Sequence, residues 1–200
     1  SEFKDKNVEY VIGFSHVNNN TVNSIVSKFQ QVDFFMLMIA AFASINNKIG
    51  WACSGQNQGY RKNLFVKVNG FKKIQHCLQG DDTLFFQLAK NKNNFTCCMN
   101  QDSYVQCRTE LHLFSFLKQR IRWAGDANIM WKYNKKFYLM ILSTFIINTI
   151  ILFLFITQFY YNAIGLLCLK TLLELIFFNI GKKRFKLNID LSKYLIWSVL

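Results

Sequence analysis

The chain contains no charged residue between Phe137 and Leu169, and this long apolar stretch limits how it can fold. A helix needs about 20 apolar residues to cross a bilayer, and a more polar break near Gln158 divides the stretch in two. Another apolar run extends from Tyr194 to Leu200. We therefore expect membrane spans over about residues 137–157 and 162–181 and a third, truncated span from about residue 191.

The formal net charge of +13 comes from Lys and Arg residues that are scattered except beside the apolar stretch. Basic clusters stand at its outer ends, in segments 132–136 and 182–186. Such flanks remain in the cytosol, so we expect both clusters there and the break at 158–162 outside. Lys170 and Glu174 stand four residues apart and can pair on one helix face. The scattered charge forms no patch for nucleic acid, and no nucleic-acid partner is expected.

Cysteine and histidine spacing predicts neither a disulfide framework nor a metal site. The six cysteines include the adjacent pair Cys97 and Cys98 and form no CxxC motif. We expect free, reduced and mostly buried thiols, as in a cytosolic domain. The histidines show no ligand spacing, so no metal site is expected on His16, His76 and His112.

The residues before the apolar stretch alternate short strands with helices. Strands are expected over residues 8–14, 51–54, 95–99 and 104–107, and helices over 21–45, 82–90 and from about 110. This alternation predicts an α/β domain. The uncharged part of the first helix, 34–45, is too short to span a bilayer and is expected in the core or at a membrane surface. We therefore divide the chain into a partial cytosolic domain, 1–136, and a transmembrane region, 137–200.

The segment Gln119–Arg120–Ile121–Arg122–Trp123 carries the most functional information. At about 100° per residue, a helix here gathers an amide, a guanidinium, an indole and a carboxylate on one face: Gln119, Arg122, Trp123 and Asp126. The opposite face is expected to be buried: Phe114, Leu117, Ile121 and Ala124. An indole packs on a sugar ring and a guanidinium forks onto a phosphate. The alternative is an amphipathic helix anchored by Trp123 at a membrane surface.

Three further segments stand upstream of this motif. They are Cys53–Ser54–Gly55–Gln56–Asn57–Gln58–Gly59–Tyr60–Arg61–Lys62, then Val68–Asn69–Gly70–Phe71, then Gly80–Asp81–Asp82. In this order they resemble the "CSGxNxxxRK", "GGF", "ED" and Q(Q/R)xRW motifs of membrane-bound family 2 glycosyltransferases. That group, of the GT-A type, includes the cellulose, chitin and hyaluronan synthases.

The resemblance covers roughly residues 7–136 and departs from the family pattern twice. Asp81 stands where Glu is commoner, and Asn69 replaces the first Gly of the turn. Asn tolerates positive φ better than most residues, so we expect the turn to be kept.

The resemblance implies roles for particular residues. Asp82 is the implied catalytic base, with Asp81 beside it, and Arg122 the implied contact of the donor pyrophosphate. Trp123 would pack near the acceptor sugar. The remaining implied substrate-binding residues are supporting ones: Gln119, Arg120, Asn57, Arg61 and Lys62.

A plain structural role competes with the catalytic one, because an Asp before an apolar helix is often its N-cap. Neighbouring side chains diverge, so Asp81 and Asp82 cannot both aim at one carbon, and one can be base while the other caps. The divergence also argues against a glycoside hydrolase, whose two carboxyls face each other across about 5–9.5 Å.

The resemblance further implies an inverting transferase at the cytosolic membrane face, with a bacterial inner membrane as the expected location. Its partners would be a nucleotide-sugar donor, a glycan or lipid-linked acceptor and membrane lipid. The family's divalent cation, Mg²⁺ or Mn²⁺, is held by a DxD motif, and this sequence contains none. We therefore expect a C-terminal fragment that holds the acceptor and base half. Two alternatives stay open: a degenerate homologue that only binds glycan, and a polytopic membrane protein without enzymatic activity.

Overall fold

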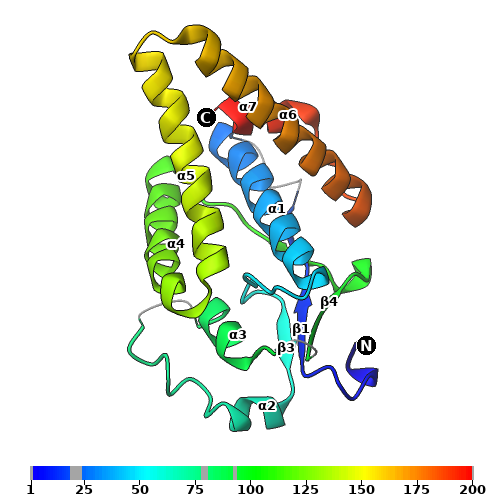
Figure 1. Ribbon diagram of the computed structural model, residues 1–200. Coiled ribbons are helices and arrows are strands. Elements are labelled where there is room, and N and C mark those ends of the chain that lie inside the picture. The colour runs from blue at the N-terminus through cyan, green and yellow to red at the C-terminus, as the bar shows by residue number, and fades with distance from the viewer. Residues whose placement is uncertain (1, 19–23, 78–80, 92–93, 200) are drawn as a thin grey trace.

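The computed structural model describes residues 2–18, 24–77, 81–91 and 94–199, without the side chains of residues 126–128 and 199. Small sheets lie at one end of the molecule, and long helices rise from them (Figure 1). The helices are α1 (Ile25–Asn46), α2 (Lys62–Lys67), α3 (Thr83–Ala89), α4 (Leu113–Tyr133), α5 (Lys135–Ile156), α6 (Tyr160–Phe185) and α7 (Leu191–Val199). Single 3₁₀ turns occur at Glu2–Lys4 and Gln101–Ser103.

Two small sheets form the base of the domain. In the first, β1 (Tyr10–Gly13) lies between β3 (Gln58–Tyr60), which is antiparallel to it, and β4 (Phe95–Cys98), which is parallel. In the second, β2 (Ser15–Val17) pairs in parallel with β5 (Val105–Cys107). Every residue of β1 is buried, which explains why it is apolar without alternation.

The predicted α/β class is only partly correct. Helices dominate the described residues, and the three-stranded sheet is mixed. The parallel pairs β1–β4 and β2–β5 retain an α/β element, because each is joined by a crossover that contains helices. The strands expected over 8–14, 95–99 and 104–107 are found with shorter bounds, and the helix expected over 82–90 is α3.

The strand predicted over 51–54 is wrong, because no strand forms there. Side chains satisfy this backbone instead of a ladder: Ser44 Oγ accepts from Trp51 N, and Gln87 Nε2 donates to Trp51 O. Thr83 Oγ1 likewise donates to Cys53 O. The nearby segment that does pair with β1 is β3, which begins at Gln58.

Helix α1 is the central element of the core. It begins with a capping box in which the Ser24 and Ser27 side chains exchange hydrogen bonds with the backbone. Residues 19–23, where the sequence places the start of this helix, lie outside the described part. Rings from β1–β2, α1 and α6 meet at Phe14, which is stacked on Phe185 at 4.0 Å between centroids and edge-on to Phe42 at 5.4 Å.

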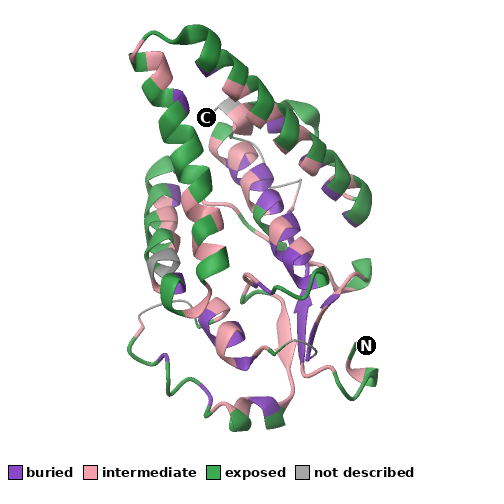
Figure 2. Ribbon diagram, in the orientation of Figure 1, coloured by how far each residue is buried: buried purple, intermediate pink, exposed green. Residues whose placement is uncertain are grey.

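Helices α5 and α6 form an antiparallel hairpin that the rest of the protein leaves largely uncovered (Figure 2). The described residues contain three helices long and apolar enough to cross a membrane, namely α1, α5 and α6. Of the apolar window of α1, 56% is buried inside the protein, against 6% for α5 and 11% for α6. The packing therefore makes α1 a core helix, and the hairpin the membrane-spanning candidate. Its turn is at residues 157–159, with Gln158 at φ 65°.

The predicted charge pair within α6 is confirmed: Lys170 Nζ lies 3.1 Å from Glu174 Oε1. The segment expected to begin a third span is α7, a short helix that packs along α1 with Tyr194 fully buried. Phe178 and Phe185 of α6 belong to the same hydrophobic core as β1 and α1. The division at residue 136 stays a prediction, but the two parts share one core.

All six cysteines are free, as expected. Only two of them, Cys53 and Cys97, are buried, so the expectation of mostly buried thiols is wrong. Cys168 is exposed because it lies on the uncovered hairpin.

Candidate functional site

Asp82 caps helix α3 and also binds a loop far away in the sequence. Its Oδ1 accepts a hydrogen bond from Thr83 N at 2.5 Å, and its Oδ2 accepts one from Gly55 N at 2.8 Å. The structural role that competes with catalysis is therefore real. A carboxylate has about four lone-pair sites, so two N–H donors fix its orientation and still leave sites for another partner. Asp81 is exposed.

The close approach of Asp82 depends on the absence of a side chain at Gly55. A Cβ atom built there would lie 3.1 Å from Asp82 Oδ2 and 3.2 Å from Asp82 Cβ. Such contacts are tighter than ordinary van der Waals distance. The glycine therefore lets the loop backbone clamp the carboxylate directly.

Asn57 fixes the far end of the same loop. Its Nδ2 donates to Phe14 O at 2.9 Å and to Ser103 O at 2.8 Å, and its backbone O accepts from Gly13 N. A Cβ at Gly13 would fall 2.2 Å from Asn57 Oδ1, so the strand and the amide fit only with glycine there. Both donor hydrogens of the amide are thus committed to the backbone.

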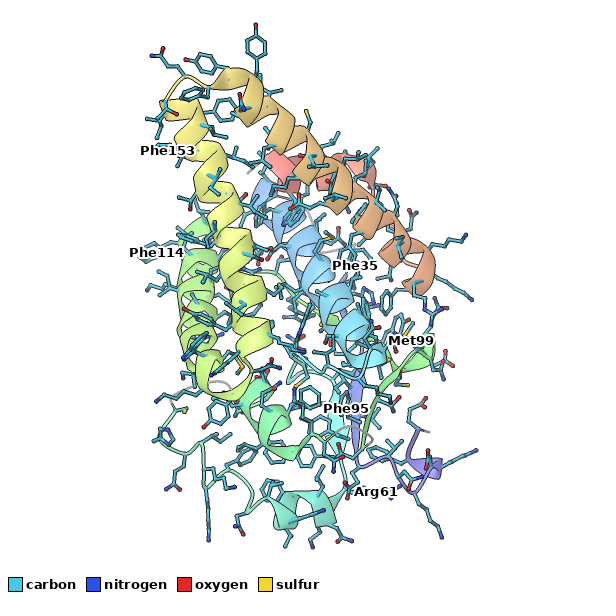
Figure 3. The ribbon with its side chains drawn as sticks, viewed as in Figure 1. Phe35, Arg61, Phe95, Met99, Phe114 and Phe153 are labelled. Carbon is cyan, nitrogen blue, oxygen red and sulfur yellow. The ribbon has the colours of Figure 1, made fainter. Side chains whose placement is uncertain are left out.

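Arg61 holds the N-terminal segment against the loop. Its guanidinium donates to Val8 O at 2.8 Å and to Phe3 O at 2.7 Å, and it lies over the Phe3 ring. Figure 3 shows Arg61 at the end of the domain beside the short helix α2, away from the long helices. Lys62, its neighbour, is exposed. These contacts make Arg61 a tether for the described N-terminus.

A buried polar cluster lies behind the Asp82 loop. Tyr10 Oη donates to Gln58 Oε1 at 2.5 Å, and Cys53 Sγ donates to the same oxygen at 3.2 Å. Burial raises the pKa of the Cys53 thiol, and the Asp82 charge raises it further. Burial likewise raises the pKa of the Tyr10 hydroxyl. Both groups therefore stay protonated and neutral and support the loop as hydrogen-bond donors.

The signature segment lies on α4, and Arg120 attaches it to α1. Arg120 forms an ion pair with Asp33. Its guanidinium also lies 4.9 Å from the Phe116 ring centroid and 4.3 Å from that of Trp123. Burial raises the pKa of Asp33, and the Arg120 charge opposes this. Burial lowers the pKa of Arg120, and Asp33 opposes that shift.

The other signature residues have different surroundings. Gln119 Nε2 donates to Glu110 Oε1 at 3.4 Å, and the Glu110 backbone exchanges hydrogen bonds with the Gln30 side chain. Trp123 is half-buried, and Arg122 is exposed. The side chain of Asp126, predicted on the same stripe, lies outside the described part.

The predicted burial of the opposite face is wrong. Phe114 is 70% exposed and Ile121 is 73% exposed, and Figure 3 shows Phe114 directed away from the rest of the molecule. Leu117 and Ala124 are exposed as well. The face that packs inward carries Phe116, Arg120 and Met130 instead, because the Asp33 ion pair turns this side toward α1.

Two clusters of predicted site residues therefore exist. One surrounds Asp82 and Gly55, and the other surrounds Arg120 and Trp123. Across the described residues, no hydrogen bond or ion pair joins them directly. Helices α3 and α4 are linked instead by Asn134 Nδ2, which donates to Gln87 Oε1 at 3.0 Å.

Asp33 and Gln30 were missed by sequence reasoning. Both lie in the more polar first part of α1, near Ser27, Lys28 and Gln31, so nothing in the sequence sets them apart. A buried charge or amide needs a partner, but the partner comes from α4 or from the segment before it, about 80 residues later. No sequence period connects the two helices.

Phe116 and Ile121 provide a direct test of which side of α4 is packed. Phe116→Ala should lower the free energy of unfolding by about 3–5 kcal/mol, the usual cost of truncating a buried Phe. Ile121→Ala should change it by less than about 0.5 kcal/mol, as for an exposed surface site. The measurement is denaturant or thermal unfolding of the two purified variants. Equal destabilisation would contradict the observed orientation of the helix.

Comparison with known protein families assigns this sequence to one of them. The model of glycosyl transferase family group 2 matches residues 1–187, which include both clusters and the hairpin. No curated protein sequence matches the chain significantly. The family match extends beyond the segment that carries the motifs and includes α5 and α6. Because the match covers most of the chain, this protein belongs to glycosyl transferase family group 2.

Proposed function

We propose that the protein transfers a sugar from a nucleotide-sugar donor to a glycan or lipid-linked acceptor at the cytosolic face of a membrane, with inversion. The acceptor hydroxyl oxygen attacks the anomeric carbon. The bond from that carbon to the donor phosphate breaks, and the nucleoside diphosphate leaves with its electron pair. Asp82 takes the proton of the acceptor hydroxyl. The motifs point to a membrane-bound enzyme of the kind that includes cellulose, chitin and hyaluronan synthases.

The observation that carries this proposal is the clamp on Asp82. A general base must be held within hydrogen-bond reach of the proton that it abstracts. Two backbone N–H groups, from Thr83 and Gly55, fix this carboxylate on two separate segments. A residue that served only as a helix cap would need the first of these bonds alone.

We assign different roles to the remaining residues. Arg122 is exposed and is free to fork onto the donor pyrophosphate. Trp123 offers one indole face to the acceptor sugar while Arg120 covers the other. Asn57 and Arg61 position the acceptor-side loop through their backbone contacts and need not touch substrate. Gln119 holds α4 through Glu110.

The described part of the chain offers no ligand set that fits the divalent cation of the family. Among the described residues, no group of three or more His, Cys, Asp or Glu side chains gathers where an ion could bind. A DxD motif would have to supply the ligands, and this sequence has none.

Variants of Asp82 and Asp81 distinguish the loss of the catalytic base from the loss of a negative charge at this site. In the full-length protein in membranes, Asp82→Asn should lower the transfer rate by about 10²–10⁴-fold, the usual contribution of a general base. Binding of the donor should remain near wild type, since only proton abstraction is lost. Asp81→Asn is the matched control and should have a smaller effect. The assay is sugar transfer together with nucleotide-sugar binding.

The reverse order of effects would assign the base to Asp81. No loss in either variant would favour a protein that only binds glycan, or a membrane protein without enzymatic activity.

Arg122 and Trp123 should affect different substrates. Arg122→Lys keeps the positive charge but loses the planar fork, so affinity for the nucleotide product should fall. Trp123→Ala removes a flat apolar surface and should chiefly raise the acceptor KM. Nucleotide binding and acceptor kinetics of the two variants provide the measurement. If both variants weakened binding of the same substrate, this division of roles would be wrong.

The uncovered apolar surfaces support a membrane location. The exposed apolar face of α4 joins the uncovered hairpin through α5, which directly follows it. Lys118 and Lys132 on α4 are exposed and suit anionic lipid headgroups. We propose that this face of α4 lies on the membrane surface and that α5 and α6 span the bilayer, with both basic ends in the cytosol.

Cysteine labelling in intact cells tests this topology. Asn162→Cys, in the first turn of α6, should react with a membrane-impermeant thiol reagent, and Lys183→Cys should not. Both positions are exposed on the protein itself, so a difference between them reports the membrane. The parent protein without the added cysteine is the control. Labelling of position 183 from outside would overturn the hairpin orientation.

A further inference from the structure

Asp33 connects three helices at one point. This carboxylate of α1 pairs with Arg120 of α4 and accepts a hydrogen bond from Trp197 Nε1 of α7 at 3.2 Å. Its side chain is only 22% exposed. A buried charge is tolerated where it is paired and hydrogen-bonded, so Asp33 and Arg120 depend on each other.

The ion pair determines where the Arg120 guanidinium lies. The guanidinium stands between two rings of its own helix, Phe116 and Trp123. Its Nε atom is buried and has no hydrogen-bond partner among the described residues. Asp33 is therefore the ionic contact that holds the guanidinium against the Trp123 ring.

We propose that Asp33 is a positioning residue for acceptor use and acts through Arg120 on the Trp123 indole. A cation over an aromatic face is attracted to the ring, so a fixed guanidinium restricts the tilt of the indole. A fixed indole leaves its other face ready for a sugar ring. The proposal rests on the proposed role of Trp123 in acceptor binding.

The position of Asp33 fits a positioning role better than a role in donor binding. Asp33, on α1, contacts the inward side of α4 through Arg120. Arg122, the proposed phosphate contact, is exposed. The carboxylate would also repel a pyrophosphate. Loss of Asp33 should therefore change the acceptor parameters and leave the donor parameters unchanged.

The first test is Asp33→Asn, which keeps the size of the side chain and an oxygen for Trp197. The acceptor KM should rise about 10–100-fold, the range expected when a substrate contact is misplaced by about 1 Å, and the donor KM should not change. Arg120→Lys keeps a positive charge for Asp33 but loses the planar group over Trp123. It should show the same selective effect.

Two further variants separate this coupling from general damage. The double variant Asp33→Asn/Arg120→Gln should be no worse in acceptor KM than Arg120→Gln alone, because coupled residues are not additive. Asp190→Asn is the control, since its carboxylate is exposed and lies 3.9 Å from Lys193. Additive effects, or equal losses for donor and acceptor, would overturn the proposal.

A readout independent of activity distinguishes this inference from the proposed function. In protein labelled with fluorotryptophan, Asp33→Asn should shift the fluorine resonances of Trp123 and Trp197 and leave those of Trp51 and Trp131 unchanged. Substitution of each Trp by Phe assigns the signals. An unmoved Trp123 signal would refute the positioning role. If the Trp123 signal shifted but the wild-type protein showed no transfer activity, the proposed function would be refuted and the contact between Asp33 and Trp123 would stand.

Discussion

The burial of α1 between the sheets and the later helices is the constraint on which the rest of the structure depends. Helix α1 contacts β2 and β4 of the two sheets and also α6 and α7. The fit is close enough that a Cβ at Gly181 of α6 would fall 2.0 Å from Ile39 Cδ1. Because protein interiors are close-packed, this contact sets where α6 enters the core. It also brings the hairpin against the domain that carries the motifs.

The same helix sets the orientation of the signature segment. Asp33 turns the Arg120 side of α4 inward, and the apolar side that contains Phe114 and Ile121 stays uncovered. An uncovered apolar face next to an apolar hairpin suits a membrane surface. A sugar site that uses Trp123 and a membrane contact that uses Phe114 and Ile121 are therefore compatible, because they lie on different sides of the helix, whereas the alternative anchored by Trp123 would need the same side as the sugar.

Local signals in the sequence predicted part of the local structure around the candidate site. Asp82 before an apolar run predicted a helix cap, and Asn69 predicted a positive φ, observed at 63°. Both depend on chemistry within a few residues. The bond from Gly55 to Asp82 and the ion pair from Asp33 to Arg120 link residues far apart in the chain, so no local pattern reveals them. Hydrophobic periodicity identified α4 but assigned the wrong face to the core, since the period alone does not distinguish an apolar face that is buried from one that stays uncovered.

The missing strand at 51–54 has a similar cause. A short segment between Gly50 and Gly55 was predicted as a strand, but side chains of α1 and α3 satisfy its backbone. The strand order of the small mixed sheet depends on which segments pair with β1. The positions of strands along the sequence do not predict that pairing. Family resemblance supplied the roles of the residues, and the structure supplied the contacts that hold them.

The central claim is that the Gly55 loop clamps Asp82 for proton transfer, and Gly55→Ala tests it without removing any reacting group. The added methyl would press on the carboxylate at 3.1 Å, whereas in the control Gly59→Ala it would meet only Phe3 at 3.5 Å. The measurement is kcat for sugar transfer by the two variants in membranes, with donor binding measured in parallel. The account predicts a kcat at least about 10-fold lower for Gly55→Ala than for Gly59→Ala, with donor binding retained in both. Equal kcat values for the two variants would contradict it.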